Sequence, residues 1–213
     1  MALTKLNDVA FYEAGHALLS YLFSDIIEIH HVTIDPEYSK TFDIHSDGGV
    51  LFKHLINPEN LNQFEIDLLC LSFLAGLAAD LINEHNGTVS ENFFYSPEFS
   101  RKIQHHNYQG DMIIHSNFFN QIEDQVKIPR SEYNYLSLKL LLTIFSDEKI
   151  QEDLINLRNL LEKSKTLEGK TLRSYLDGSY IILESENLER YKREPKEIIL
   201  LTGDTIAFLT SAS

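Results

Sequence analysis

The feature that most constrains the fold is the apolar run IDLLCLSFLAGLAADLI, which covers residues 66–82. The run is shorter than the roughly 20 apolar residues that a helix needs to span a bilayer, and it contains Asp67 and Asp80. The segment NPEN at 57–60 is a helix-start signal, so a helix is expected over 61–83. We therefore expect a buried central helix rather than a membrane span, with other helices packed around it.

Helical periodicity recurs along much of the remaining chain. Apolar residues at intervals of three to four predict a first helix over about 7–23, with Asn7 or Asp8 as its cap. Ser96 followed by Pro97 predicts a further helix start, with serine as the N-cap. The same periodicity predicts helices over about 110–126, 130–147 and 148–164, and a short helix ending near Asp177.

Strand signals are fewer and shorter. The segments IIEIHHVTID and GGVLFKHL are rich in β-branched and aromatic residues and predict two strands of a small sheet. After Gly178 the composition changes to short β-like runs, YIILE and EIILLTGDTIAFL. The expected fold class is therefore mainly α with a small β-sheet, as one domain over 1–178, followed by a short β-like C-terminal appendage over 179–213 whose role the sequence does not indicate.

Composition excludes several classes of function. The formal net charge of −14 repels phosphate backbones and anionic membrane surfaces, so no nucleic acid partner is expected. Cys70 is the only cysteine and lies in the apolar run, which excludes a disulfide framework or a cysteine-rich metal site and predicts a small buried side chain. The first twenty residues do not form a signal peptide, and a cytoplasmic location is expected.

The stretch FYEAGHALLSYLF, in the first predicted helix, is one residue short of a zinc-peptidase motif. In H-E-x-x-H, two histidines four residues apart lie on one helix face and bind one zinc, while the glutamate polarises the zinc-bound water. Here Glu13 and His16 match that pattern, but Tyr12 stands in place of the first histidine. A phenol has a pKa of about 10 and must lose its proton to bind metal well, so tyrosine is a poor substitute.

Several segments together resemble the peptidase domain of FtsH-type ATP-dependent zinc metalloproteases. VAFYEAGHALLSYLF, IIEIHHVTIDP, FLAGLAADLI, GDMI and LLEKSKTLEGKTLRSYL occur in the order typical of that family, over roughly residues 7–177. The resemblance implies a mainly helical fold and unfolded proteins or peptides as partners. It also implies that Glu13 is the catalytic base and that His16 and Asp111 are zinc ligands. DGGVLF resembles the family's edge strand, to which a substrate peptide can add.

Other histidines could contribute to a metal site. His115 follows Asp111 by four residues in a predicted helix, so it could complete a rebuilt site with His16 and Asp111, or it could be an ordinary polar residue. Adjacent residues point to different faces of an element, so neither the pair at 30–31 nor the pair at 105–106 is expected to chelate a metal by itself.

Two functional hypotheses follow, with a third as a remainder. The first is a catalytically inactive module that binds peptides or proteins and requires no cofactor. The alternative is a zinc-dependent endopeptidase with a rearranged site, in which Glu13 is the base and the ligands are His16, Asp111 and either His115 or Tyr12. The third is an oligomeric structural protein. The chain carries no G-x-x-x-x-G-K-[ST] loop, so ATP-driven unfolding by this chain alone is not expected.

Overall fold

The computed structural model describes residues 2–22, 28–40, 48–52, 63–104, 106–124, 126 and 128–176. In these residues the protein is mainly helical with a small sheet, as the sequence predicts; the sheet is antiparallel and has three strands. The predicted boundary after residue 178 and the predicted appendage over 179–213 lie outside the described residues.

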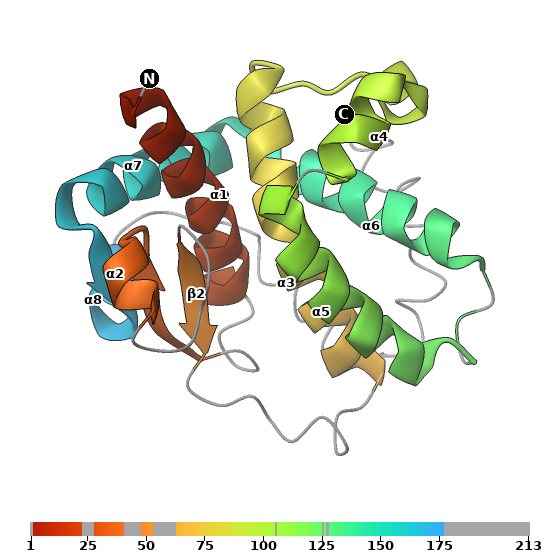
Figure 1. Cartoon of the computed structure of the whole chain (residues 1–213), viewed down its shortest axis with the longest axis horizontal. Helices are drawn as coiled ribbons and strands as arrows, with labels where there is room; N and C mark the ends of the chain where they lie inside the picture. The colour runs from red at the N-terminus through yellow and green to blue at the C-terminus, as the bar shows by residue number, and fades with distance from the viewer. Residues whose placement is uncertain are drawn as a thin grey trace.

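The centre of the fold is α3 (Gln63–Glu84). It packs on α1 (Ala2–Leu22) on one side and on α5 (His106–Ile122) and α6 (Arg130–Phe145) on the other (Figure 1). Helix α7 (Glu148–Ser164) covers α1. Every residue of the apolar run 66–82 is buried except Asp80, which is half-buried. The prediction of a buried central helix is confirmed.

One helix in the described part of the chain is long and apolar enough to cross a membrane, and it is this same α3. Its qualifying window, Ile66–Glu84, is 89% buried inside the protein. The other helices bury α3 and so remove its apolar surface from water, as a lipid bilayer would.

Small residues bring α1 and α3 into close contact. A Cβ added at Gly15 of α1 would lie 2.6 Å from the Ala79 Cβ and 2.7 Å from the Ala75 carbonyl oxygen, both on α3. These distances are too short for any side chain, so glycine sets the helix separation. The segment LAGLAADL is therefore a site of close helix packing.

The sheet has the order β2-β1-β3. The two predicted strands, β1 (Ile29–Thr33) and β2 (Gly49–Phe52), pair antiparallel, which confirms both. The third strand, β3 (Thr166–Glu168), was not predicted; it follows α7 and pairs antiparallel with β1 before α8 (Gly169–Leu176) begins. The short helices α2 (Pro36–Lys40) and η2 (Glu91–Tyr95) were not predicted either.

Helix boundaries differ from those predicted in two places. Helix α1 begins at Ala2, so the expected caps at residues 7 and 8 lie inside it; no glycine or proline stands between Ala2 and Asn7 to stop the helix earlier. Helix α5 begins at His106 and includes Gly110 within its span. By contrast, α4 (Pro97–Ile103) begins as predicted, and the Ser96 hydroxyl accepts from the Phe99 N–H as its N-cap.

Candidate functional site

Helices α1 and α5 bring together four of the candidate residues, although α1 and α5 are far apart in the sequence. The Tyr12 hydroxyl donates a hydrogen bond to Oδ2 of Asp111, across 99 residues of chain. The His16 Nε2 lies 3.3 Å from the same carboxylate oxygen. Glu13 is buried between them and the start of β2. We call Tyr12, Glu13, His16 and Asp111 the polar cluster.

Helix α3 fixes the His16 ring. The His16 Nδ1 donates to the backbone carbonyl of Ser72 at 2.6 Å, which leaves Nε2 facing Asp111. The neighbouring turn of α3 carries Gly76, where an added Cβ would lie 2.4 Å from His16 Nε2 and 2.6 Å from Tyr12 Cε2. Gly76 therefore provides the space in which both rings reach Asp111. A carbonyl that holds one imidazole nitrogen while the other faces a ligand is also the arrangement that orients metal-binding histidines.

The polar cluster contains one buried ion pair. Burial lowers the pKa of His16, but the charge and hydrogen bond of Asp111, the charge of Glu13 and the Ser72 carbonyl together outweigh burial and raise the pKa to about 9. Burial raises the pKa of Asp111, but His16 and then the Tyr12 hydrogen bond hold it below its ordinary value. At neutral pH His16 is thus protonated and Asp111 ionised, and their opposite charges compensate each other away from water.

The other two members of the polar cluster are neutral at pH 7. Burial raises the pKa of Glu13 to about 8; His16 partly offsets this, and the carboxylates of Asp111 and Asp80 add to it. Burial, followed by the Asp111 charge, raises the pKa of the Tyr12 phenol well above its ordinary value. A protonated Glu13 cannot accept a proton from water, which is the role that the resemblance implies for it.

The donor set of the polar cluster does not fit a catalytic zinc. Such a zinc takes three protein ligands, with imidazole in its neutral form, and keeps one position open for water. Here His16 and Asp111 are the two conventional donors, and the Tyr12 phenol keeps its proton and donates it to the Asp111 oxygen that a metal would need. Among the described residues, no three or more His, Cys, Asp or Glu side chains are grouped so that they could hold a metal ion.

The structure does not bring His115 to the polar cluster. His115 is fully buried, with its ring parallel to Phe119 at a centroid distance of 6.5 Å and 6.3 Å from the Tyr133 ring. Four residues advance a helix by about 6 Å along its axis, so His115 lies past α1 and meets α6 instead. Within the described residues neither ring nitrogen has a hydrogen-bond partner. Burial, and then the charge of Arg130, lowers the pKa of His115 to about 4.

A second buried polar group, which sequence reasoning missed, links α3 to α6. The Tyr133 hydroxyl donates to Asp67 Oδ1 at 2.5 Å, and burial raises the pKa of Asp67 to about 6, partly offset by that hydrogen bond. Cys70 is buried beside them, as predicted, and burial raises the pKa of its thiol. The available signal was Asp67 itself, because a carboxylate inside a buried helix needs a donor from another element.

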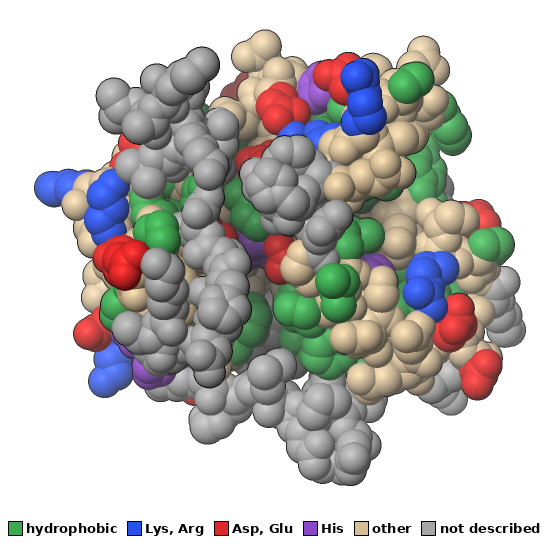
Figure 2. Space-filling model, viewed as in Figure 1, with side chains coloured by type: hydrophobic (Ala, Val, Ile, Leu, Met, Phe, Trp, Pro, Cys, Tyr) green, Lys and Arg blue, Asp and Glu red, His purple; other side chains and the backbone are tan. Residues whose placement is uncertain are grey.

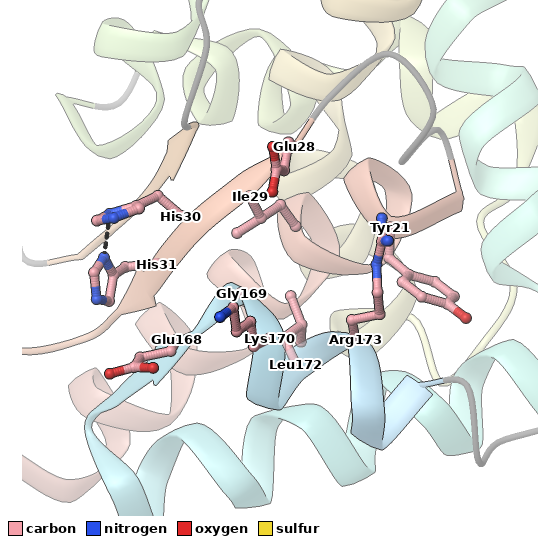
Figure 3. A pocket seen from close by; sticks show the side chains of 10 residues that line it. All are labelled: Tyr21, Glu28, Ile29, His30, His31, Glu168, Gly169, Lys170, Leu172 and Arg173. Carbon is pink, nitrogen blue, oxygen red and sulfur yellow. Dashed lines mark hydrogen bonds between the residues drawn. The ribbon is translucent and has the colours of Figure 1, made fainter.

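The adjacent histidines of β1 do not point to different faces, which corrects the sequence-based expectation. The register of β1 against β2 passes from Ile29↔Phe52 to His31↔Leu51, so β1 contains one extra residue, a bulge at His30. A bulge changes the direction in which the side chain of the extra residue, His30, points. The two imidazoles face each other, with their Nδ1 atoms 2.6 Å apart (Figure 3). Of the other pair, residue 105 and the side chain of residue 106 lie outside the described residues.

Comparison with known protein-family models and with curated proteins found no match to this chain. A neutral tyrosine, a neutral glutamic acid and one internal ion pair form a group of side chains whose charges compensate each other. Such a group stabilises the contact between α1 and α5 and supplies neither a free base nor a set of metal ligands.

Proposed function

We propose that this chain is an FtsH-peptidase-like domain that binds peptide or protein segments and does not cleave them. The observation that carries the proposal is the hydrogen bond from Tyr12 to Asp111. It joins the residue that replaces the first motif histidine to the carboxylate that the resemblance assigns to zinc. The phenol thus satisfies, inside the protein, the group that a metal would otherwise engage.

The edge strand β2 is the surface that this function would use. In the described sheet β2 pairs with β1 alone, so its outer backbone N–H and C=O groups offer a template for an added strand. Its N-terminal end reaches the polar cluster, because a Cβ added at Gly48 would lie 3.0 Å from both the Glu13 Cγ and Oε1 atoms. A bound peptide would therefore run past the polar cluster without requiring chemistry from it.

Helix α5 also carries exposed apolar side chains. Ile113 is 61% exposed and Ile114 41% exposed, directly after Asp111 in the helix. Hydrophobic side chains gather over α5 on the face shown in Figure 2. Exposed apolar groups and a free strand edge on one domain suit an unfolded segment, which presents both apolar side chains and backbone hydrogen-bonding groups.

One observation favours the alternative of a zinc endopeptidase. The Ser72 carbonyl fixes the His16 ring with Nε2 facing Asp111, which is how a zinc-bound histidine is held. The two proposals differ in metal requirement, so one assay separates them. Fluorescence anisotropy of a labelled unfolded peptide should show binding in the presence of a chelator, and gel analysis should show no cleavage with or without added Zn²⁺. Cleavage that depends on Zn²⁺ would establish the endopeptidase instead.

Proline substitutions test the strand edge. Successive backbone N–H groups of an edge strand alternate between the sheet and the free side. One of the variants Val50→Pro and Leu51→Pro therefore removes a backbone N–H that points outward, and the other removes a backbone N–H that pairs with β1. Thermal unfolding distinguishes them, because only the loss of pairing with β1 should lower the melting temperature. The variant that retains the wild-type melting temperature should lose peptide affinity by about two- to tenfold, because about one outward hydrogen bond is lost. Unchanged affinity in that variant would place the peptide elsewhere.

A further inference from the structure

We infer that the His30–His31 pair at the bulge of β1 is a binding site for a first-row transition-metal ion of the Zn²⁺ class, separate from the polar cluster. The two rings lie on the same side of the strand, at a centroid distance of 4.1 Å and an interplanar angle of 77°. Two Nδ1 atoms 2.6 Å apart can hold only one proton between them, one donating and the other accepting. A metal ion takes the place of that proton.

The separation of the nitrogens is close to what one ion requires. With Zn–N bonds of about 2.0–2.1 Å and a tetrahedral angle, two ligating nitrogens lie about 3.3 Å apart. The imidazoles must therefore open by about 0.7 Å from their contact, and each ring must turn by roughly 35° so that both lone pairs point at the ion. Both rings are half-buried, and a cavity of about 420 Å³ adjoins them, so there is room for this movement.

Glu168 on β3 is placed to supply a third ligand. It is the partner of His31 in the β1–β3 register, and directly opposed residues of an antiparallel pair share a face of the sheet. Figure 3 shows Glu168 on the same side as His31, with an extended, outward side chain. Glu168 is exposed, so turning its carboxylate toward the histidines disturbs no packing. No three possible ligands are grouped in advance among the described residues, so the Glu168 carboxylate has to turn toward the histidines. Water would complete the coordination.

The chemistry of the donors selects the metal. Two imidazoles and one carboxylate suit Zn²⁺, Ni²⁺ and Cu²⁺, whereas Mg²⁺ and Ca²⁺ prefer oxygen ligands alone. Burial, and then the neighbouring His30, lowers the pKa of His31, while Glu168 acts in the opposite direction. The Nδ1–Nδ1 contact itself requires that the accepting imidazole is neutral at Nδ1, which is the form that binds metal.

The consequence of binding is a link between two strands that are otherwise weakly joined. β3 has three residues, and its pairing with β1 comprises His31↔Glu168, Val32↔Leu167 and Thr33↔Thr166. A metal held by β1 on one side and by β3 on the other would tie the α7–β3–α8 segment to the sheet. Because binding to the folded state alone stabilises it, Zn²⁺ should raise the melting temperature.

The test is calorimetric titration of Zn²⁺ into the full chain, freed of any purification tag, at pH 7.5, with thermal unfolding in parallel. The expected result is one equivalent bound, with a higher melting temperature. His30→Gln and His31→Gln should each weaken binding at least about tenfold, since even groups that only orient metal ligands contribute 10–100-fold. Glu168→Gln, at an exposed position that the fold tolerates, should weaken it measurably. His85→Gln, a half-buried histidine packed on Phe93, is the matched control and should bind as the wild type.

Three results would overturn the inference. One is the absence of Zn²⁺ binding by the wild type. Another is binding that is unchanged in the folded Glu168→Gln variant and in both histidine variants. The third is binding that survives His30→Gln and His31→Gln but disappears in His16→Gln, which would assign the ion to the polar cluster and would count against the proposed function as well.

Discussion

The replacement of His115 by leucine should stabilise the protein, and by more at pH 5.5 than at pH 7.5. His115 is fully buried with no hydrogen-bond partner for either ring nitrogen among the described residues, and leucine has no polar atom to leave unsatisfied. One buried polar group without a partner costs about 1–3 kcal/mol. At pH 7.5, where the imidazole is neutral, His115→Leu should therefore raise the free energy of unfolding by about that amount.

Proton linkage sets the additional effect at lower pH. Burial lowers the pKa of His115 from 6.5 to about 4, so between those values the unfolded chain binds the proton and the folded protein does not. The free energy of unfolding must then fall as the pH falls through this window, by about 3 kcal/mol in all, since each pKa unit corresponds to about 1.4 kcal/mol. From pH 7.5 to pH 5.5 the His115 contribution is between about 1 and 2 kcal/mol.

The wild-type pH profile alone does not isolate this contribution. The pKa of His16 is raised to about 9, so its contribution is fully present below pH 6.5 and is lost as the pH rises through 9, opposite in sign to that of His115. Urea unfolding of wild type, His115→Leu and His115→Gln at both pH values removes the His16 contribution by difference. Both variants should lose the pH-dependent contribution of His115 to the free energy of unfolding, but only His115→Leu should be more stable than the wild type at pH 7.5. A wild-type-minus-leucine difference that is the same at both pH values would refute the reasoning.

The remaining predictions concern the rest of the helical core. Gly76→Ala should lower the free energy of unfolding by about 1–3 kcal/mol, because the added Cβ would overpack the Tyr12 and His16 rings. Gly110→Ala has nothing within 4 Å of the added Cβ and should raise the free energy of unfolding by about 0.5–1 kcal/mol. Urea unfolding measures both. Tyr12→His should strengthen Zn²⁺ binding at the polar cluster at least about tenfold in a titration of the His30→Gln background, and no strengthening would contradict the ligand assignment. Tyr133→Phe should destabilise by about 1–3 kcal/mol, because it leaves a buried carboxyl without its donor. Tyr135→Phe, which removes an exposed hydrogen bond to Glu91, should cost less than about 1 kcal/mol.

The parts of the fold that local signals determine could be predicted. Helix α3 follows from its apolar run, and α4 from the N-cap serine that accepts from Phe99. β3 could not be predicted, because Thr166–Glu168 has no alternation of its own and is a strand through its pairing with β1. Helix starts were displaced where the sequence offered a good cap but no residue that stops a helix, as at Asn7.

The candidate site shows the same division between local and long-range causes. The motif residues of α1 could be placed on one helix face from the sequence, and the resemblance named Asp111 as their neighbour. The position of His115 could not be found, since a helix face is wide enough for Asp111 to meet α1 while His115 meets α6. The contact between the two β1 histidines depends on a bulge, which is a property of the pairing with β2 and not of either residue.

In the polar cluster, the residue at position 12 affects the protonation of the other three side chains. A divalent cation would bring two positive charges to this point of the fold and would hold both Glu13 and Asp111 ionised. With Tyr12 there, the carboxylate of Asp111 is compensated by a proton on His16 and by the phenol hydrogen bond, and Glu13 keeps its own proton. The group is electrically neutral without a metal, so it has no electrostatic need for one. The presence of Glu13 and His16 is then accounted for by the stability of the α1–α3–α5 contact, and it does not by itself argue for peptidase activity.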